Sequence, residues 1–129
     1  MDKAQALHSF WSGFGIPAID ENSAYDEKAK QQLGISDRYI AYDVGTGDIV
    51  TGPVALTSSI WYRSTSWTDI SQKAEAVNAA IGYGGYRAEI DGGYIWITKG
   101  SPFARRLIDE ADLSWRRIIF NINAEFLTA

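Results

Sequence analysis

Residues 115–127 read WRRIIFNINAEFL and carry the most regular alternation of apolar and polar side chains in the chain. Successive side chains of a β-strand point to opposite faces, so this alternation predicts a strand with one face in the core. The side chains expected in the core are Ile118, Phe120, Ile122, Ala124 and Phe126. The other face would carry Ile119, Asn121, Asn123 and Glu125. We therefore expect that face to be either solvated or covered by a partner.

Two earlier segments extend the predicted sheet. Residues 38–44 predict one strand, and residues 49–63 predict a second strand that forms an antiparallel hairpin with the first. Pro53, in the second segment, indicates that this strand lies at the edge of the sheet, contains a bulge or begins near the proline. Beyond the proline, alternation places Trp61 and Arg63 together on one face of the sheet.

A second hairpin follows later in the chain. The sequence DGG at residues 91–93 predicts a tight turn within residues 86–100, because glycine tolerates the positive φ that such turns require. Residues 100–113 read GSPFARRLIDEADL. We interpret this stretch as a loop with one turn of helix near residues 103–108.

Helical periodicity occurs in two segments. Apolar side chains recur at spacings of three and four in residues 2–14 and again in residues 68–81. The two stripes are Leu7, Phe10, Trp11 and Phe14 in the first segment, and Ile70, Ala74, Val77 and Ile81 in the second. Ser66 with Asp69, or Thr68 alone, can supply the N-terminal cap of the second helix.

Together these elements predict a single α+β domain spanning residues 1–129. Its mainly antiparallel sheet of about four to five strands would carry two helices packed on one face. A chain of 129 residues has the size of one ordinary domain, and its hydrophobic content of 46% is normal for a folded protein. Residues 24–33 lie in a polar stretch, which we predict to be a loop that contains a short helix.

Charge and composition argue against several classes of function. The formal net charge is -4 and the basic residues are scattered, which argues against stable binding of nucleic-acid phosphates by the monomer. No apolar run is long enough to span a bilayer and the N-terminus does not resemble a secretory signal, so we expect no membrane association. The chain has no cysteine, which excludes disulfides and thiolate chemistry and fits synthesis in the cytosol.

Candidates for catalysis or metal binding are few. His8 is the only histidine, and neither a GxSxG elbow nor a cysteine accompanies it, so a structural role is favoured over catalysis. Carboxylates gather in residues 20–27 and 109–112, but their spacings match no calcium loop. The glycine-rich stretches 45–48 and 82–85 read as turns, because neither has the order and lysine of a phosphate loop. We therefore predict no enzyme, no metal site and no cofactor.

Aromatic and arginine residues indicate where a partner could bind. Trp61 and Arg63 share a strand face, and Arg105 and Arg106 lie in the predicted loop. These residue types are enriched in interface cores, so the four residues are candidates for a subunit interface. The alternatives are a core or junction role for the rings and a solvated loop for the arginine pair. A nucleic-acid platform would need a basic groove in addition to the rings.

Four stretches of the chain resemble the small tail terminator proteins of long-tailed phages, which are also called tail completion or minor tail proteins. The stretches are FWSGFGIPAIDE (10–21), LTSSIWYRSTSWTDISQKAE (56–75), DGGYIWITKGSPFARR (91–106) and RRIIFNINAEFLTA (116–129). The resemblance spans about residues 9–128. Residues 24–38, AYDEKAKQQLGISDR, fit the pattern poorly and look like an insertion.

The resemblance implies an α+β virion structural protein without catalysis, metal or cofactor. Such proteins form a homo-oligomeric ring, typically of six, on the head-proximal end of the tail tube. The ring ends growth of the tube protein, offers a surface to head-completion or connector proteins, and lets DNA pass through its lumen. It is assembled in the cytoplasm of the bacterial host. The alternatives are another neck or head-closure protein and, with less support, a small-ligand or carbohydrate-binding module that uses the aromatic rings.

Overall fold

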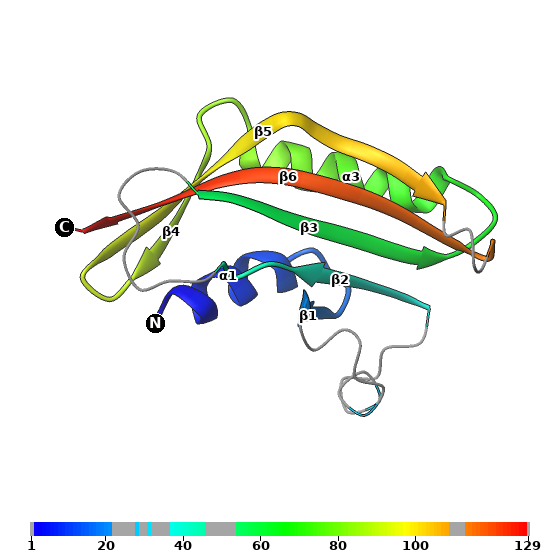
Figure 1. Cartoon of the computed structure of the whole chain (residues 1–129), viewed down its shortest axis with the longest axis horizontal. Helices are drawn as coiled ribbons and strands as arrows, with labels where there is room; N and C mark the ends of the chain where they lie inside the picture. The colour runs from blue at the N-terminus through cyan, green and yellow to red at the C-terminus, as the bar shows by residue number, and fades with distance from the viewer. Residues whose placement is uncertain are drawn as a thin grey trace.

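The computed structural model describes residues 2–21, 37–45, 54–108 and 113–128, together with Lys28 and Gln31. The helices are α1 (Lys3–Ser12) and α3 (Thr68–Ile81). The strands are β1 (Ala18–Asp20), β2 (Arg38–Tyr42), β3 (Val54–Arg63), β4 (Tyr86–Ile90), β5 (Gly93–Ile108) and β6 (Trp115–Thr128). Figure 1 shows β3, β6 and β5 running side by side, with α3 lying along them.

Within the described residues the sheet is mixed and has six strands, in the order β1-β2-β3-β6-β5-β4. Strand β1 runs parallel to β2, and the other neighbouring pairs are antiparallel. The predicted α+β class is confirmed, but the prediction of an antiparallel sheet of four to five strands is wrong. Strand β1 was missed because its three residues are too few to show an alternation. The Ile40 amide donates to the Pro17 carbonyl oxygen at 2.8 Å, where the parallel pairing starts.

Strand β6 lies at the centre of this sheet, between β3 and β5. Its pairing with β3 runs from Val54 opposite Ala124 to Arg63 opposite Trp115. On the helix side of β6, Phe120 and Ala124 have no exposed surface (0%). The prediction that residues 115–127 form a strand with this buried face is therefore confirmed.

Strand β5 continues through the segment that was predicted as a loop with a helical turn. It remains paired with β6 as far as Ile108, and a register shift after Lys99 marks a bulge. Bulges accommodate glycine and proline within a strand, which explains why the turn-like sequence misled the prediction. A Cβ atom on Gly100 would lie 2.8 Å from the Asn121 carbonyl oxygen, so glycine allows the two strands to approach this closely.

The two helices begin differently. Helix α1 starts with a capping box in which the Gln5 amide donates to Asp2 Oδ1 at 2.8 Å and the Asp2 amide donates to Gln5 Oε1 at 2.9 Å. Helix α3 has the bounds that its periodicity predicts, but Trp67 occupies its N-cap position without a side-chain cap hydrogen bond. Ser66 Oγ instead accepts a hydrogen bond from the Thr68 amide at 3.1 Å. Neither predicted cap of α3 therefore forms in the expected way.

Both described helices pack against the same face of the sheet. Leu7 and Trp11 of α1 and Val77 and Ile81 of α3 join Phe120 in one core cluster. A smaller cluster lies on the other face and consists of Ile19, Tyr39 and Ala41, with Trp61 and Trp115 packed against it. We call this second face the open face, because neither α1 nor α3 packs on it. The fold therefore divides side chains between a helix-covered core and an open face.

Some predictions concern residues outside the described part of the chain. The short helix expected in residues 24–33 lies there, apart from Lys28 and Gln31, and so does most of the insertion-like segment 24–38. The start of the second predicted strand, residues 49–53, and the acidic stretch 109–112 also lie outside the described residues. These predictions stay predictions.

The division between the two faces of β6 can be tested by paired substitutions. Phe120→Ala removes a fully buried ring and should lower the free energy of unfolding by about 3–5 kcal/mol. Asn123→Ala, on the open face of the same strand, should change it by about 0.5 kcal/mol or less. Urea denaturation followed by tryptophan fluorescence measures both values. Equal losses in the two variants would contradict the assignment of faces.

Candidate functional site

Three of the four predicted interface residues lie on the open face. In β3, Trp61 and Arg63 alternate with side chains that belong to the core under the helices. Arg105 of β5 is exposed and pairs with Ile119 of β6, which points away from the buried Phe120 side. The structure therefore places Trp61, Arg63 and Arg105 on one surface, although they are far apart in the sequence.

Three aromatic rings from three strands meet on this surface, and we call them the aromatic patch: Tyr39 of β2, Trp61 of β3 and Trp115 of β6. The Tyr39 and Trp61 rings are nearly parallel, with centroids 6.1 Å apart and an interplanar angle of 11°. Trp115 stands edge-on to both, at 6.1 Å from Tyr39 and 6.4 Å from Trp61. Such stacked and edge-to-face contacts add stability beyond the area that they bury. The patch is therefore an ordered surface.

Two arginines cover the aromatic patch. The Arg117 guanidinium carbon lies 4.7 Å from the centroid of the Trp61 ring, and Arg117 Nε donates to Ser59 Oγ at 3.0 Å. The Arg63 guanidinium carbon lies 5.3 Å from the Trp115 ring. Cation–π contacts of this kind hold the charged groups over the rings and still leave them accessible to solvent or a partner. Broad rings and accessible guanidinium groups are typical of protein interfaces.

Arg106 lies on the opposite side of the sheet from Arg105, because neighbouring residues of a strand alternate in direction. Its guanidinium carbon is 5.1 Å from the Trp67 ring, and its Nη2 donates to Ser71 Oγ of α3 at 3.3 Å. Arg116 also contacts Trp67, at 5.5 Å, and its Nη2 donates to the Thr65 carbonyl oxygen at 3.2 Å. Arg106 therefore connects β5 to the start of α3, which is a contact within the subunit.

Three residues of this surface were not predicted: Tyr39, Trp115 and Arg117. Alternation alone predicts that Tyr39 points to the face of the sheet opposite to the core residue Ile40. The contact of each residue with Trp61 follows from strand register, with Tyr39 and Arg117 directly opposite Trp61 in the neighbouring strands. Register between strands distant in sequence cannot be read from the pattern of one strand.

A carboxyl group beside this surface has a raised pKa. The pKa of Glu21 is above its ordinary value of 4.5 because the group is partly buried, and the nearby carboxylate of Asp43 adds to the shift. The positive charge of Arg117 opposes the shift, and Asp20 adds a smaller rise. Glu21 thus lies at the end of β1, in an environment that disfavours its charged carboxylate form.

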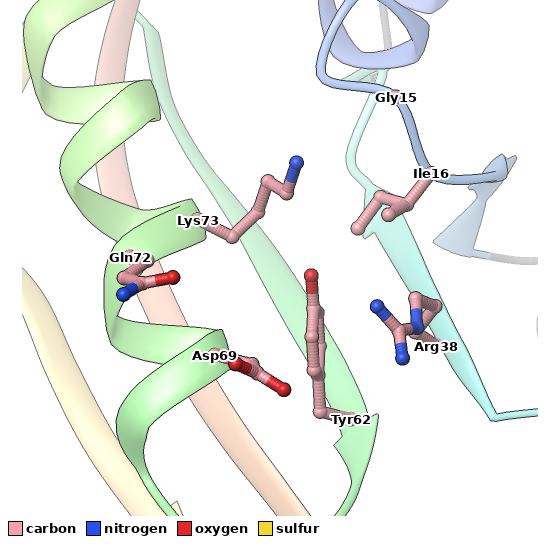
Figure 2. Close-up of a pocket in the computed structure, with 7 residues that line it drawn as sticks. All are labelled: Gly15, Ile16, Arg38, Tyr62, Asp69, Gln72 and Lys73. Atoms are coloured by element: carbon pink, nitrogen blue, oxygen red, sulfur yellow. The ribbon is translucent and has the colours of Figure 1, made fainter.

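A separate pocket of about 310 Å³ lies between α3 and the turn that follows α1 (Figure 2). Its lining residues are Gly15, Ile16, Arg38, Tyr62, Asp69, Gln72 and Lys73. Lys73 Nζ donates to the Phe14 carbonyl oxygen at 2.6 Å, so its ammonium group joins α3 to this turn. Pockets for organic ligands usually have mostly apolar walls, whereas polar side chains dominate this lining. We therefore interpret the pocket as a polar junction between the two helices.

The Tyr62 hydroxyl points into this pocket in Figure 2. Burial raises the pKa of Tyr62, and the charge of Arg38 and its hydrogen bond to the phenol partly oppose that rise. The Arg38 guanidinium carbon lies 4.9 Å from the Tyr62 ring. The hydroxyl therefore stays protonated at neutral pH, when it can donate a hydrogen bond within the junction.

His8 joins α1 to the sheet. Its Nδ1 lies 2.8 Å from the Tyr42 hydroxyl, and burial, followed by the charge of Asp20, raises the pKa of Tyr42. Across the described ranges, no group of three or more His, Cys, Asp or Glu side chains is placed to hold a metal ion. No helix in the described part of the chain is long and apolar enough to cross a membrane.

Comparison of the chain with protein families, curated proteins and solved structures gave no match.

Neighbouring arginines on the two sides of β5 should respond differently to removal. Arg106→Ala loses the contact with Trp67 and the hydrogen bond to Ser71, so it should lower the free energy of unfolding by about 0.5–1 kcal/mol. Arg105→Ala removes an exposed side chain and should change it by less than about 0.5 kcal/mol. Denaturant titration of both variants provides the measurement. A larger loss for Arg105→Ala would show that their roles are reversed.

The raised pKa of Glu21 predicts a pH-dependent effect of Glu21→Gln. The Glu21 carboxyl group keeps its proton to a higher pH in the folded chain than in the unfolded chain. The free energy of unfolding of the wild type therefore falls as the pH rises above 4.5. The uncharged glutamine avoids this cost, and the variant should melt at a higher temperature at neutral pH. The gain should shrink when the pH falls below 4.5, where both states of the wild type are protonated. Thermal unfolding at several pH values tests it; a gain independent of pH would contradict the explanation.

Proposed function

We propose that this chain is a tail terminator protein of a long-tailed phage, a virion structural protein that acts by assembly. The observation that carries the proposal is the resemblance of residues 10–21, 56–75, 91–106 and 116–129 to that family. In the fold these stretches contribute β1 and most of β3, α3, β5 and β6, so the resemblance concerns one connected part of the molecule.

In this proposal the protein forms a homo-oligomeric ring, typically of six, on the head-proximal end of the tail tube. The ring stops the addition of tail tube protein and presents a surface to a head-completion or connector protein. It belongs to the neck of the virion and is assembled in the host cytoplasm. The net charge of -4 suits a conduit for DNA, because a negative surface repels phosphate and lets the duplex pass without binding.

The open face supports assembly as the mode of action. It presents the partly buried rings of Trp61 and Trp115, which pack on the buried Tyr39, beside Arg63 and Arg117. Neither α1 nor α3 packs on it. Tryptophan, tyrosine and arginine are the residues that most often dominate binding energy at protein interfaces. A surface of this composition fits recognition by shape and charge in a subunit contact.

Deletion of the gene tests the function directly. In the phage that encodes this chain, loss of the protein should give overlong or headless tails, because nothing would stop tube growth or join the head. A plasmid copy of the gene should restore normal virions. Electron microscopy of lysates measures tail length and head attachment. Normal virions would overturn the proposal, and tails of normal length beside unjoined, leaking heads would indicate another neck protein instead.

A further inference from the structure

We propose that the open face of one copy of this chain binds the outer side of α3 of a second copy, so that copies associate head to tail. The two surfaces lie on opposite sides of the sheet, since α3 belongs to the helix-covered face. The pairing of these surfaces follows from their charge and shape. That the resulting chain of copies closes into a ring rests on the proposed function.

The end of the open face around Trp61 contributes positive charge to this contact, whereas Glu89 and Glu125 lie toward its other end. Arg63 and Arg105 are both exposed, and Arg117 lies partly buried between them over the Trp61 ring. The rings beneath the arginines provide a broad apolar floor, so a partner would meet guanidinium groups and aromatic edges together. Guanidinium groups donate well to carboxylates, so an acidic counterpart is the natural partner.

The outer side of α3 has the complementary charge. Its exposed residues are Thr68, Asp69, Gln72, Glu75, Ala76, Ala79 and Ala80. The basic groups near the helix have contacts within the subunit: Lys73 donates to the Phe14 carbonyl oxygen, and Arg106 to Ser71 Oγ. Asp69 lines the polar pocket beside Lys73, and Glu75 is the other exposed acid of α3. Glu75 is therefore the acid that α3 presents to a partner.

Small side chains on α3 favour a close approach to a second copy. Short alanine side chains on the exposed side of α3 would let the helix approach a sheet closely. Tyr83, just beyond the end of α3, is fully exposed and extends the apolar part of this side. The contact joins two different surfaces of identical chains, so each copy keeps one surface of each kind available. Contacts of this heterologous type continue into rings or filaments, whereas self-complementary contacts end at a dimer.

Cysteine crosslinking tests the pairing, because the natural chain contains no cysteine. Thr57→Cys places a thiol on the open face, and Ala76→Cys places one on the outer side of α3; both positions are exposed. A short bis-maleimide should crosslink a mixture of the two variants, at a protein concentration of about 1 mM, into a covalent dimer. Each variant alone should give about tenfold less dimer, because only one thiol is then present at each contact. Ser9→Cys, on the exposed side of α1, is the control partner.

Charge reversal tests the electrostatic part. Arg63→Glu with Arg105→Glu, introduced into the Thr57→Cys chain, should reduce crosslinking about tenfold, because like charges would then face each other. Glu75→Arg in the Ala76→Cys chain should restore it in the mixture. Arg87→Glu is the control within the open face and should leave the yield unchanged, because Arg87 lies opposite Trp96, at the other end of β5 from Arg105.

Several outcomes would overturn the pairing. No crosslink in the mixture at this concentration would do so, as would equal crosslinking of Thr57→Cys with itself, which indicates face-to-face dimers. Binding of a labelled oligonucleotide that is lost in the double arginine variant would identify the open face as a nucleic-acid surface instead. Overlong tails after gene deletion without the crosslink would refute this pairing and leave the proposed function intact. The crosslink together with normal virions would refute the proposed function and leave the pairing intact.

Discussion

Backbone hydrogen bonding joins β6 to β3 along one edge and to β5 along the other, over nearly the whole length of the strand. A slip of one residue in either pairing would move Phe120 and its alternate neighbours from the core to the other face. The burial of that ring under α1 and α3 therefore holds the register of the three longest strands. The same register brings Arg117 opposite Trp61, so the open face depends on the core for its geometry.

The two faces use different kinds of contact. Aliphatic side chains fill the helix-covered face together with aromatic rings such as Phe10, Trp11 and Phe120, and shape decides the packing there. On the open face, two stacked rings meet a third edge-on, and arginines cover them. The guanidinium groups contact the rings but do not bury them permanently. A guanidinium group can exchange an aromatic ring for a carboxylate at modest cost in free energy. A surface built in this way is ordered in the isolated subunit and remains available for a partner.

How much of the structure the sequence predicts depends on the length of each pattern. Strand β6 and helix α3 were predicted with nearly their observed bounds, because their periodicity runs over nine or more residues. Strand β1 is too short to show a pattern, and the glycine and proline near residue 100 resemble a turn although they form a bulge. The candidate surface was predicted in part. Trp61 and Arg63 follow from alternation, whereas their contacts with Trp115 and Arg117 require a register that the sequence of one strand does not contain.

The layered architecture also affects whether copies of this chain would form a closed ring or an open filament. A subunit that used the two opposite sides of a flat layer would stack its copies along a line and form a filament. The strands of a sheet twist, so the two sides of the layer are not flat planes, and a copy added across them would be rotated relative to the copy before it. If the rotation closes, the last contact forms between copies that are already held near each other, so its effective concentration is high. Individually weak, polar contacts such as arginine with Glu75 can therefore hold a closed ring without making a stable pair.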